Sequence, residues 1–201
     1  MKRSTIIILS VLGGLILLAL LIGGWITGMY NTLVKLDEGV NQSWAQVQNQ
    51  YQRRLDLIPN LVETVKGYAE HESNVFTEVA EARSSVGKLQ VTPEILNNPQ
   101  TFQKFQEAQA GLTSALSRLL AVAENYPQLK ANENFLQLQS QLEGTENRIA
   151  VERQRFNQVV QEYNTRIRTF PTAVFAGMFG FSQKAYFQAE SGAKTAPKVE
   201  F

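Results

Sequence analysis

The sequence predicts an all-α chain in which an N-terminal transmembrane helix continues into an antiparallel up-down four-helix bundle, followed by a short hydrophobic C-terminal segment. Three observations predict this fold class. Residues 6–26 carry no charge, apolar residues recur at steps of three and four through most of the remaining chain, and no long stretch alternates in polarity as a strand would. The expected parts are a basic tail, the anchor, the bundle, an aromatic segment at the membrane end and a disordered tail, at 1–5, 6–28, 29–170, 171–189 and 190–201.

The apolar stretch 6–26 has the length and composition of a membrane-spanning helix. Fourteen of its 21 residues are Ile, Leu or Val, and a helix of this length measures about 31 Å, close to the thickness of a bilayer's hydrocarbon core. A signal peptide has a shorter apolar core and a small-residue cleavage site, whereas this stretch ends in Gly-Gly-Trp-Ile. We therefore expect an uncleaved anchor in the lipid bilayer, represented by Ile6, Leu12, Leu17, Leu21 and Trp25.

Charges around the anchor predict its orientation. Lys2 and Arg3 precede it, whereas Lys35 on the far side is offset by Asp37 and Glu38. This bias favours a cytoplasmic N-terminus and a bundle outside the bacterial inner membrane, with the opposite orientation left open.

Without the first two cations, 17 Lys and Arg residues stand against 18 Asp and Glu residues, so there is no basic excess that would indicate nucleic acid as a partner. The chain has no cysteine, which excludes disulfides.

The first bundle helix follows the anchor without a Pro- or Gly-rich linker. Its apolar stripe runs from Leu33 to Leu55. We expect a tight turn at 53–59, where Asp56 would cap a second helix and Pro59 would lie in its first turn. The alternative is one helix that continues, kinked, through the proline.

Prolines also delimit the remaining helices. The stretch 91–99 contains two prolines and is expected to be a loop, and the third helix, which begins near Phe102, should end before Pro127. The fourth helix, 135–170, shows an almost strict heptad repeat that is typical of coiled-coil packing. Because successive helices alternate in direction in such a bundle, the fourth helix should return the chain to the membrane.

Six aromatic residues lie between positions 170 and 187, in a segment too short to span a membrane. The segment either folds back and covers the core of the bundle, or contacts the membrane surface or a neighbouring subunit. We treat its aromatic side chains as candidate assembly contacts: Phe170, Phe175, Phe179, Phe181, Tyr186 and Phe187.

Polar side chains interrupt the heptads of the fourth helix. They form a candidate network that would fix helix register, and they comprise Thr145, Glu146, Glu152, Arg153, Asn157 and Asn164. A metal or ligand site would need several converging carboxylates and histidines. The single histidine, His71, lacks the second histidine of a zinc-binding helix and is expected to be solvated. We therefore predict no catalytic residue, cofactor or metal.

Two glycines suggest contact between anchors. Gly24 and Gly28 form a G-x-x-x-G pattern, which lets membrane helices approach closely. The same spacing also arises by chance in a glycine-rich apolar segment, and Gly28 lies at the edge of the hydrocarbon. The pattern is therefore compatible with self-association without requiring it.

The chain resembles the LemA family over about residues 25–190. The residues that carry the resemblance include the blocks Arg53-Arg54-x-Asp56-Leu57-Ile58-Pro59-Asn60-Leu61-Val62-Glu63-Thr64-Val65-Lys66-Gly67-Tyr68 and Leu142-Glu143-Gly144-Thr145-Glu146-Asn147-Arg148-Ile149-Ala150. The resemblance implies an N-terminal membrane helix, an antiparallel helical bundle and no established catalytic residues. A magnetosome-membrane protein resembles the same family, which implies a role in membrane organisation.

These observations predict a non-enzymatic, single-pass membrane protein that acts as a scaffold or self-assembling membrane-organising module. Its expected partners are the lipid bilayer, further copies of itself and another membrane protein. One alternative is an accessory or regulatory subunit of a membrane protease or envelope-stress system. Another is a ligand-binding protein that uses the region of Glu146, Glu152 and Arg153.

Overall fold

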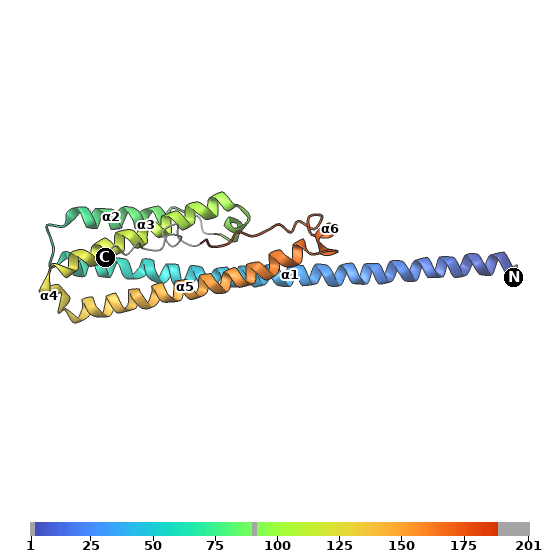
Figure 1. Cartoon of the computed structure of the whole chain (residues 1–201), viewed down its shortest axis with the longest axis horizontal. Coiled ribbons are helices and arrows are strands. Elements are labelled where there is room, and N and C mark those ends of the chain that lie inside the picture. Colours follow the sequence, from blue (N-terminus) through green and yellow to red (C-terminus); the bar gives the residue numbers. More distant parts are fainter. Residues whose placement is uncertain (1–2, 90–91, 189–201) are drawn as a thin grey trace, which may run out of the picture.

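The computed structural model describes residues 3–89 and 92–188, and these residues form helices and connections without a strand. Helix α1 (Arg3–Lys66) is 64 residues long, and its N-terminal part projects beyond the rest of the molecule (Figure 1). The other elements are α2 (Ser73–Gly87), the 3-10 helix η1 (Pro93–Asn97), α3 (Pro99–Glu124), α4 (Pro127–Lys130), α5 (Glu133–Arg168) and α6 (Thr172–Ala176). The expected all-α fold is confirmed.

The four long helices pack as two pairs. Helix α1 contacts α5 along most of the bundle, and α2 contacts α3; the two pairs lie one above the other in Figure 1. Two buried clusters fill the space between them. One surrounds Trp44 near the end from which α1 projects, and the other, around Leu61 and Leu112, fills the far end.

The predicted turn at 53–59 is wrong, because α1 continues as one helix through Pro59. Ile58 lies directly before the proline, and Leu61 and Val65 extend the buried stripe of α1 beyond it; each of the three is at most 2 % exposed. Burial of such a side chain stabilises the fold by about 1.5–3 kcal/mol, so the three together outweigh the cost of about 3 kcal/mol for a proline inside a helix. Pro59 itself is exposed.

The chain turns instead after Lys66, and α2 begins at Ser73. Asp56 is therefore not a helix cap: it lies within α1 and accepts a hydrogen bond from Gln52 Nε2 at 2.7 Å. His71 lies exposed in the connection between α1 and α2.

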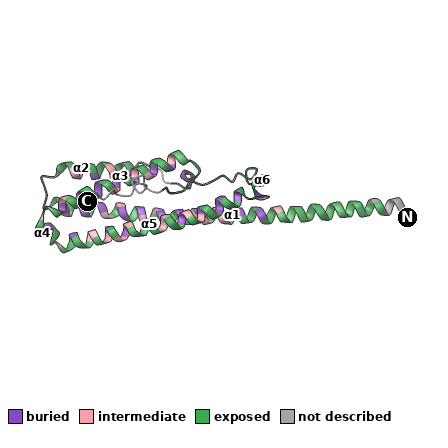
Figure 2. Ribbon diagram, in the orientation of Figure 1, coloured by how far each residue is buried: buried purple, intermediate pink, exposed green. Residues whose placement is uncertain are grey.

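The N-terminal part of α1 projects beyond the bundle, and Trp25 near its end packs against Phe175. Figure 2 shows most of this part as exposed, and burial begins at Met29, which is 4 % exposed. Leu12, Leu17, Leu21 and Trp25 are exposed, whereas the side chain of Ile6 and the tail 190–201 lie outside the described residues. Among the described helices, α1 alone is long and apolar enough to cross a membrane. This is consistent with the expected anchor.

Candidate functional site

Two asparagines of α5 hold the extended segment 182–188 by its backbone. Asn164 Nδ2 donates to the carbonyl of Lys184, and Asn164 Oδ1 accepts from the Lys184 N–H, both at 2.9 Å. Asn157 makes the same two bonds with Phe187, again at 2.9 Å. Seven helical residues rise about 10.5 Å, and three extended residues span about 10 Å, so the spacing of the asparagines matches the spacing of the residues that they hold.

The held segment completes the aromatic core. Phe187 is 6 % exposed, and its ring centroid lies 4.9 Å from that of Phe102 and 5.5 Å from that of Phe156. The Arg153 guanidinium stacks over the same ring at 4.7 Å and donates to the Gln188 carbonyl. Ala185 N–H donates to the Leu96 carbonyl of η1. The segment thus bridges α5 to the opposite layer of the bundle.

Removing both asparagine side chains should release this segment. Each asparagine makes two hydrogen bonds, and one such bond contributes about 0.5–1.5 kcal/mol. In the Asn157→Ala/Asn164→Ala variant we therefore expect amide exchange at Lys184 and Phe187 to accelerate by about tenfold or more, as measured by hydrogen–deuterium exchange.

Gln158→Ala, an exposed change on the same helix, is the control and should leave exchange unchanged. Equal protection in the double variant and the control would show that burial of Phe187 alone holds the segment.

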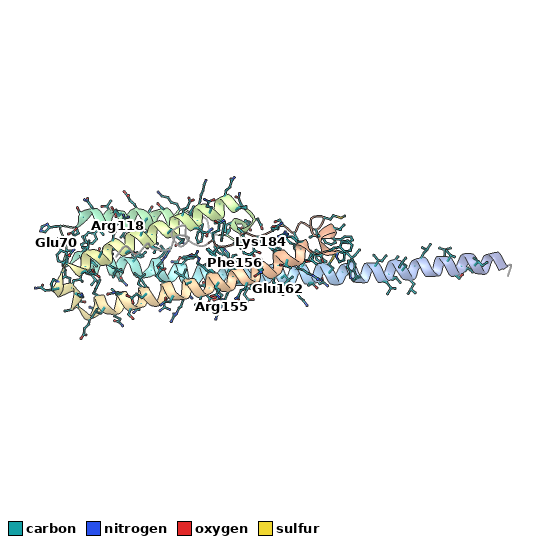
Figure 3. The ribbon with its side chains drawn as sticks, viewed as in Figure 1. Glu70, Arg118, Arg155, Phe156, Glu162 and Lys184 are labelled. Carbon is teal, nitrogen blue, oxygen red and sulfur yellow. The ribbon has the colours of Figure 1, made fainter. Side chains whose placement is uncertain are left out.

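A polar pocket of about 350 Å³ lies beside this segment, near the point where α1 leaves the bundle. Lys184 Nζ lies 2.9 Å from Asp37 Oδ1 and donates to Asn97 Oδ1 at 2.9 Å; Figure 3 marks Lys184 on the C-terminal segment. Tyr163 donates to the Ser182 carbonyl at 3.0 Å. Burial, reinforced by the Asp37 carboxylate, raises the pKa of the Tyr163 phenol, so this group stays neutral near pH 7 and acts as a hydrogen-bond donor.

A second polar cluster lies in the middle of the bundle around Arg54, which is 2 % exposed. Arg54 Nη1 bonds to Glu146 Oε1 and to Thr113 Oγ1, both at 2.9 Å, and Nη2 bonds to Gln109 Oε1. A buried guanidinium needs such partners because its charge has left water. Sequence reasoning gave no role to this arginine, although it occupies the buried stripe between Tyr51 and Ile58.

The six polar residues expected to form one network are divided among separate environments. Glu146 joins the Arg54 cluster, whereas Arg153, Asn157 and Asn164 hold the C-terminal segment. The remaining two bond locally within α5: the Thr145 hydroxyl donates to the Gln141 carbonyl, and Glu152 pairs with Arg155.

The six aromatic residues proposed as assembly contacts are also divided. Phe187 lies in the core and Phe181 is partly buried against it. Phe175 packs edge-on against Trp25, and Phe179 against Tyr30. Phe170 is 80 % exposed, and Tyr186 is exposed on the surface of the segment.

Within residues 3–89 and 92–188, no three His, Asp or Glu side chains converge as metal ligands would.

Fold and site together define an all-α bundle protein with an apolar N-terminal helix of membrane-spanning length, whose core is completed by its own C-terminal segment. The chain belongs to the LemA family, since the family model matches residues 43–201. The resemblance found in the sequence is thereby confirmed.

Several named proteins are similar to this chain. Magnetosome proteins MamQ 1 and MamQ 2 of Paramagnetospirillum magneticum are each 26 % identical to it over 188 residues, which cover 83 % of this chain and 67 % of the relative. Protein LemA of Metamycoplasma hominis is 23 % identical over 162 residues, which cover 81 % of this chain and 70 % of the relative. None of these names denotes an enzyme.

Proposed function

We propose that this protein is a non-enzymatic membrane scaffold that self-associates through its anchor and its bundle. The observation that carries the proposal is the continuity of α1. One helix of 64 residues forms both the apolar projection and a large part of the bundle core. A bundle joined to its anchor by an unbroken helix is held at a set distance from the membrane.

Anchoring makes weak contacts between copies sufficient for assembly. Confinement to one bilayer raises the effective concentration of neighbouring bundles. A Cβ added at Gly24 or Gly28 would meet nothing within 4 Å, so this part of α1 is open to a second helix. Two of the similar proteins are named magnetosome proteins, which supports a membrane-associated role. From the placement of Lys2 and Arg3, we assign the N-terminus to the cytoplasm and the bundle to the outside of a bacterial inner membrane.

The first test is the native mass of the full-length protein in mild detergent. We expect a defined multiple of the 22.5 kDa chain and a smaller species for Gly24→Leu/Gly28→Leu. A Cβ at either position meets no other atom of the chain within 4 Å, so we read a loss of mass as lost contact between chains.

Ile22→Phe is the matched control, because it adds bulk to the anchor about 200° around the helix from Gly24 and should leave the mass unchanged. A monomer for the wild-type protein would reject the scaffold proposal and favour an accessory subunit of another membrane protein.

A further inference from the structure

The most exposed large apolar side chains outside the anchor lie together, directly after α5. Phe170 is 80 %, Val174 57 % and Met178 79 % exposed. They are spaced four residues apart in a segment that contains α6 and the turn after it, where Phe179 N–H donates to the Phe175 carbonyl. Val174 and Met178 lie about one helical turn apart, and Phe170 lies in the turn between α5 and α6. We call residues 170–181 the foot.

The foot lies at the level where the apolar part of α1 ends. The Phe175 ring lies 6.1 Å from Trp25, and the Phe179 ring lies 5.3 Å from Tyr30, both edge-on. Figure 1 shows α6 beside α1 at the point where α1 leaves the bundle. Aromatic residues at the end of a transmembrane stretch mark the membrane–water interface. With α1 in a bilayer, the space around the foot is therefore the interfacial region of that bilayer.

Charge around the foot fits a lipid surface. Arg166 and Arg168 are exposed in the last turn of α5, and no acidic residue occurs from position 163 to position 181. A cation at the surface of an anionic membrane is attracted to the phosphate groups. The nearest exposed acid along α5, Glu162, lies further into the bundle (Figure 3).

We propose that the foot is a second membrane contact: Phe170, Val174 and Met178 enter the interface of the leaflet from which α1 emerges, and Arg166 and Arg168 lie at its phosphate groups. The geometry favours lipid over a protein partner because the foot packs directly on Trp25, at the end of the predicted span. One spanning helix leaves the bundle free to tilt where α1 enters the bilayer. A second contact beside that helix restricts the tilt and orients the bundle relative to the membrane plane. The inference rests on the anchor and is independent of self-association.

The chain has no cysteine, so Met178→Cys creates a unique site for an environment-sensitive fluorophore on the full-length protein. In vesicles of phosphatidylcholine mixed with phosphatidylglycerol, we expect blue-shifted emission and strong quenching by lipids that carry a spin label near the headgroup. Leu136→Cys, on an exposed position of α5 in the far half of the bundle, is the control and should be quenched several-fold less.

Two further variants separate the apolar and the ionic contributions. Phe170→Ser/Val174→Ser, combined with the label at position 178, should lose most of the lipid quenching while the helical circular dichroism stays unchanged. Arg166→Gln/Arg168→Gln should remove the difference between vesicles with and without phosphatidylglycerol.

Two results would overturn the proposal. Lipid quenching at position 178 that is no stronger than at position 136 would place the foot in water. Protection of position 178 from both lipid-borne quenchers and aqueous iodide would place it against protein, such as a second copy of the chain.

Discussion

Replacing Trp44 by alanine should destabilise the bundle by about 3–5 kcal/mol, the usual cost of removing a large buried aromatic side chain. The indole is fully buried, and its ring lies 5.5–6.0 Å from the rings of Phe102, Phe105, Phe156 and Phe187. Those four residues come from α3, α5 and the C-terminal segment, so a cavity at this position loosens three elements together. Urea unfolding in mild detergent, followed by far-ultraviolet circular dichroism, measures the change.

Two control variants test whether the loss of stability comes from removing the aromatic ring. Trp44→Phe keeps an aromatic ring and removes an indole N–H that has no hydrogen-bond partner among the described residues, so it should cost much less than alanine. Val151→Ala changes an exposed residue of α5 and should stay within about 0.5 kcal/mol of the wild type. A Trp44→Ala variant as stable as Val151→Ala would mean that the aromatic cluster contributes little to the fold.

The second large effect is expected at the buried ion pair. Glu146→Ala should cost about 3 kcal/mol, because it leaves the Arg54 charge buried with only the neutral oxygens of Gln109 and Thr113. This value is the lower end of the usual cost of removing one partner of a buried ion pair. We take the lower end because the Glu146 side chain is 36 % exposed. The free energy of unfolding in urea, compared among the single and double variants, measures the coupling between the two residues.

An apolar replacement of the whole pair separates charge burial from packing. Arg54→Met/Glu146→Leu should be within about 1 kcal/mol of the wild type or more stable, because both desolvation costs disappear. Glu152→Ala breaks the pair with Arg155 on the same helix and leaves a guanidinium whose side chain is 66 % exposed to water, so it should cost at most about 1 kcal/mol. Equal losses for Glu146→Ala and Glu152→Ala would contradict an essential role for the buried pair.

The sequence correctly predicted the elements that depend on local pattern. Helical periodicity, the stop before Pro127 and the length of the apolar stretch are properties of neighbouring residues, and α3 and α5 lie where helices were expected. The turn predicted at 53–59 was wrong. The burial that offsets the cost of Pro59 inside α1 depends on the partners of Leu61 and Val65 across the bundle, and these contacts are not visible in a local pattern.

The candidate site was only partly accessible to sequence reasoning. Asn157 and Asn164 were recognised as polar positions in an apolar repeat, but their partners lie 30 and 20 residues further along the chain. Those partners are backbone groups, which every residue carries, so no residue type marks them. The position of Arg54 on the buried stripe was a signal that could have been used.

The sequence by itself determined the class of this protein: an all-helical bundle behind an apolar helix of membrane-spanning length, with the aromatic segment at the end from which that helix projects. The tertiary structure decided how that segment is divided. Phe187 lies in the core, where an asparagine of α5 holds its backbone, whereas Phe170 follows the end of α5 and is 80 % exposed. Both residues are phenylalanine, so the residue type does not distinguish them. The arrangement of helices around each position decides which one lies in the core and which one lies on the surface.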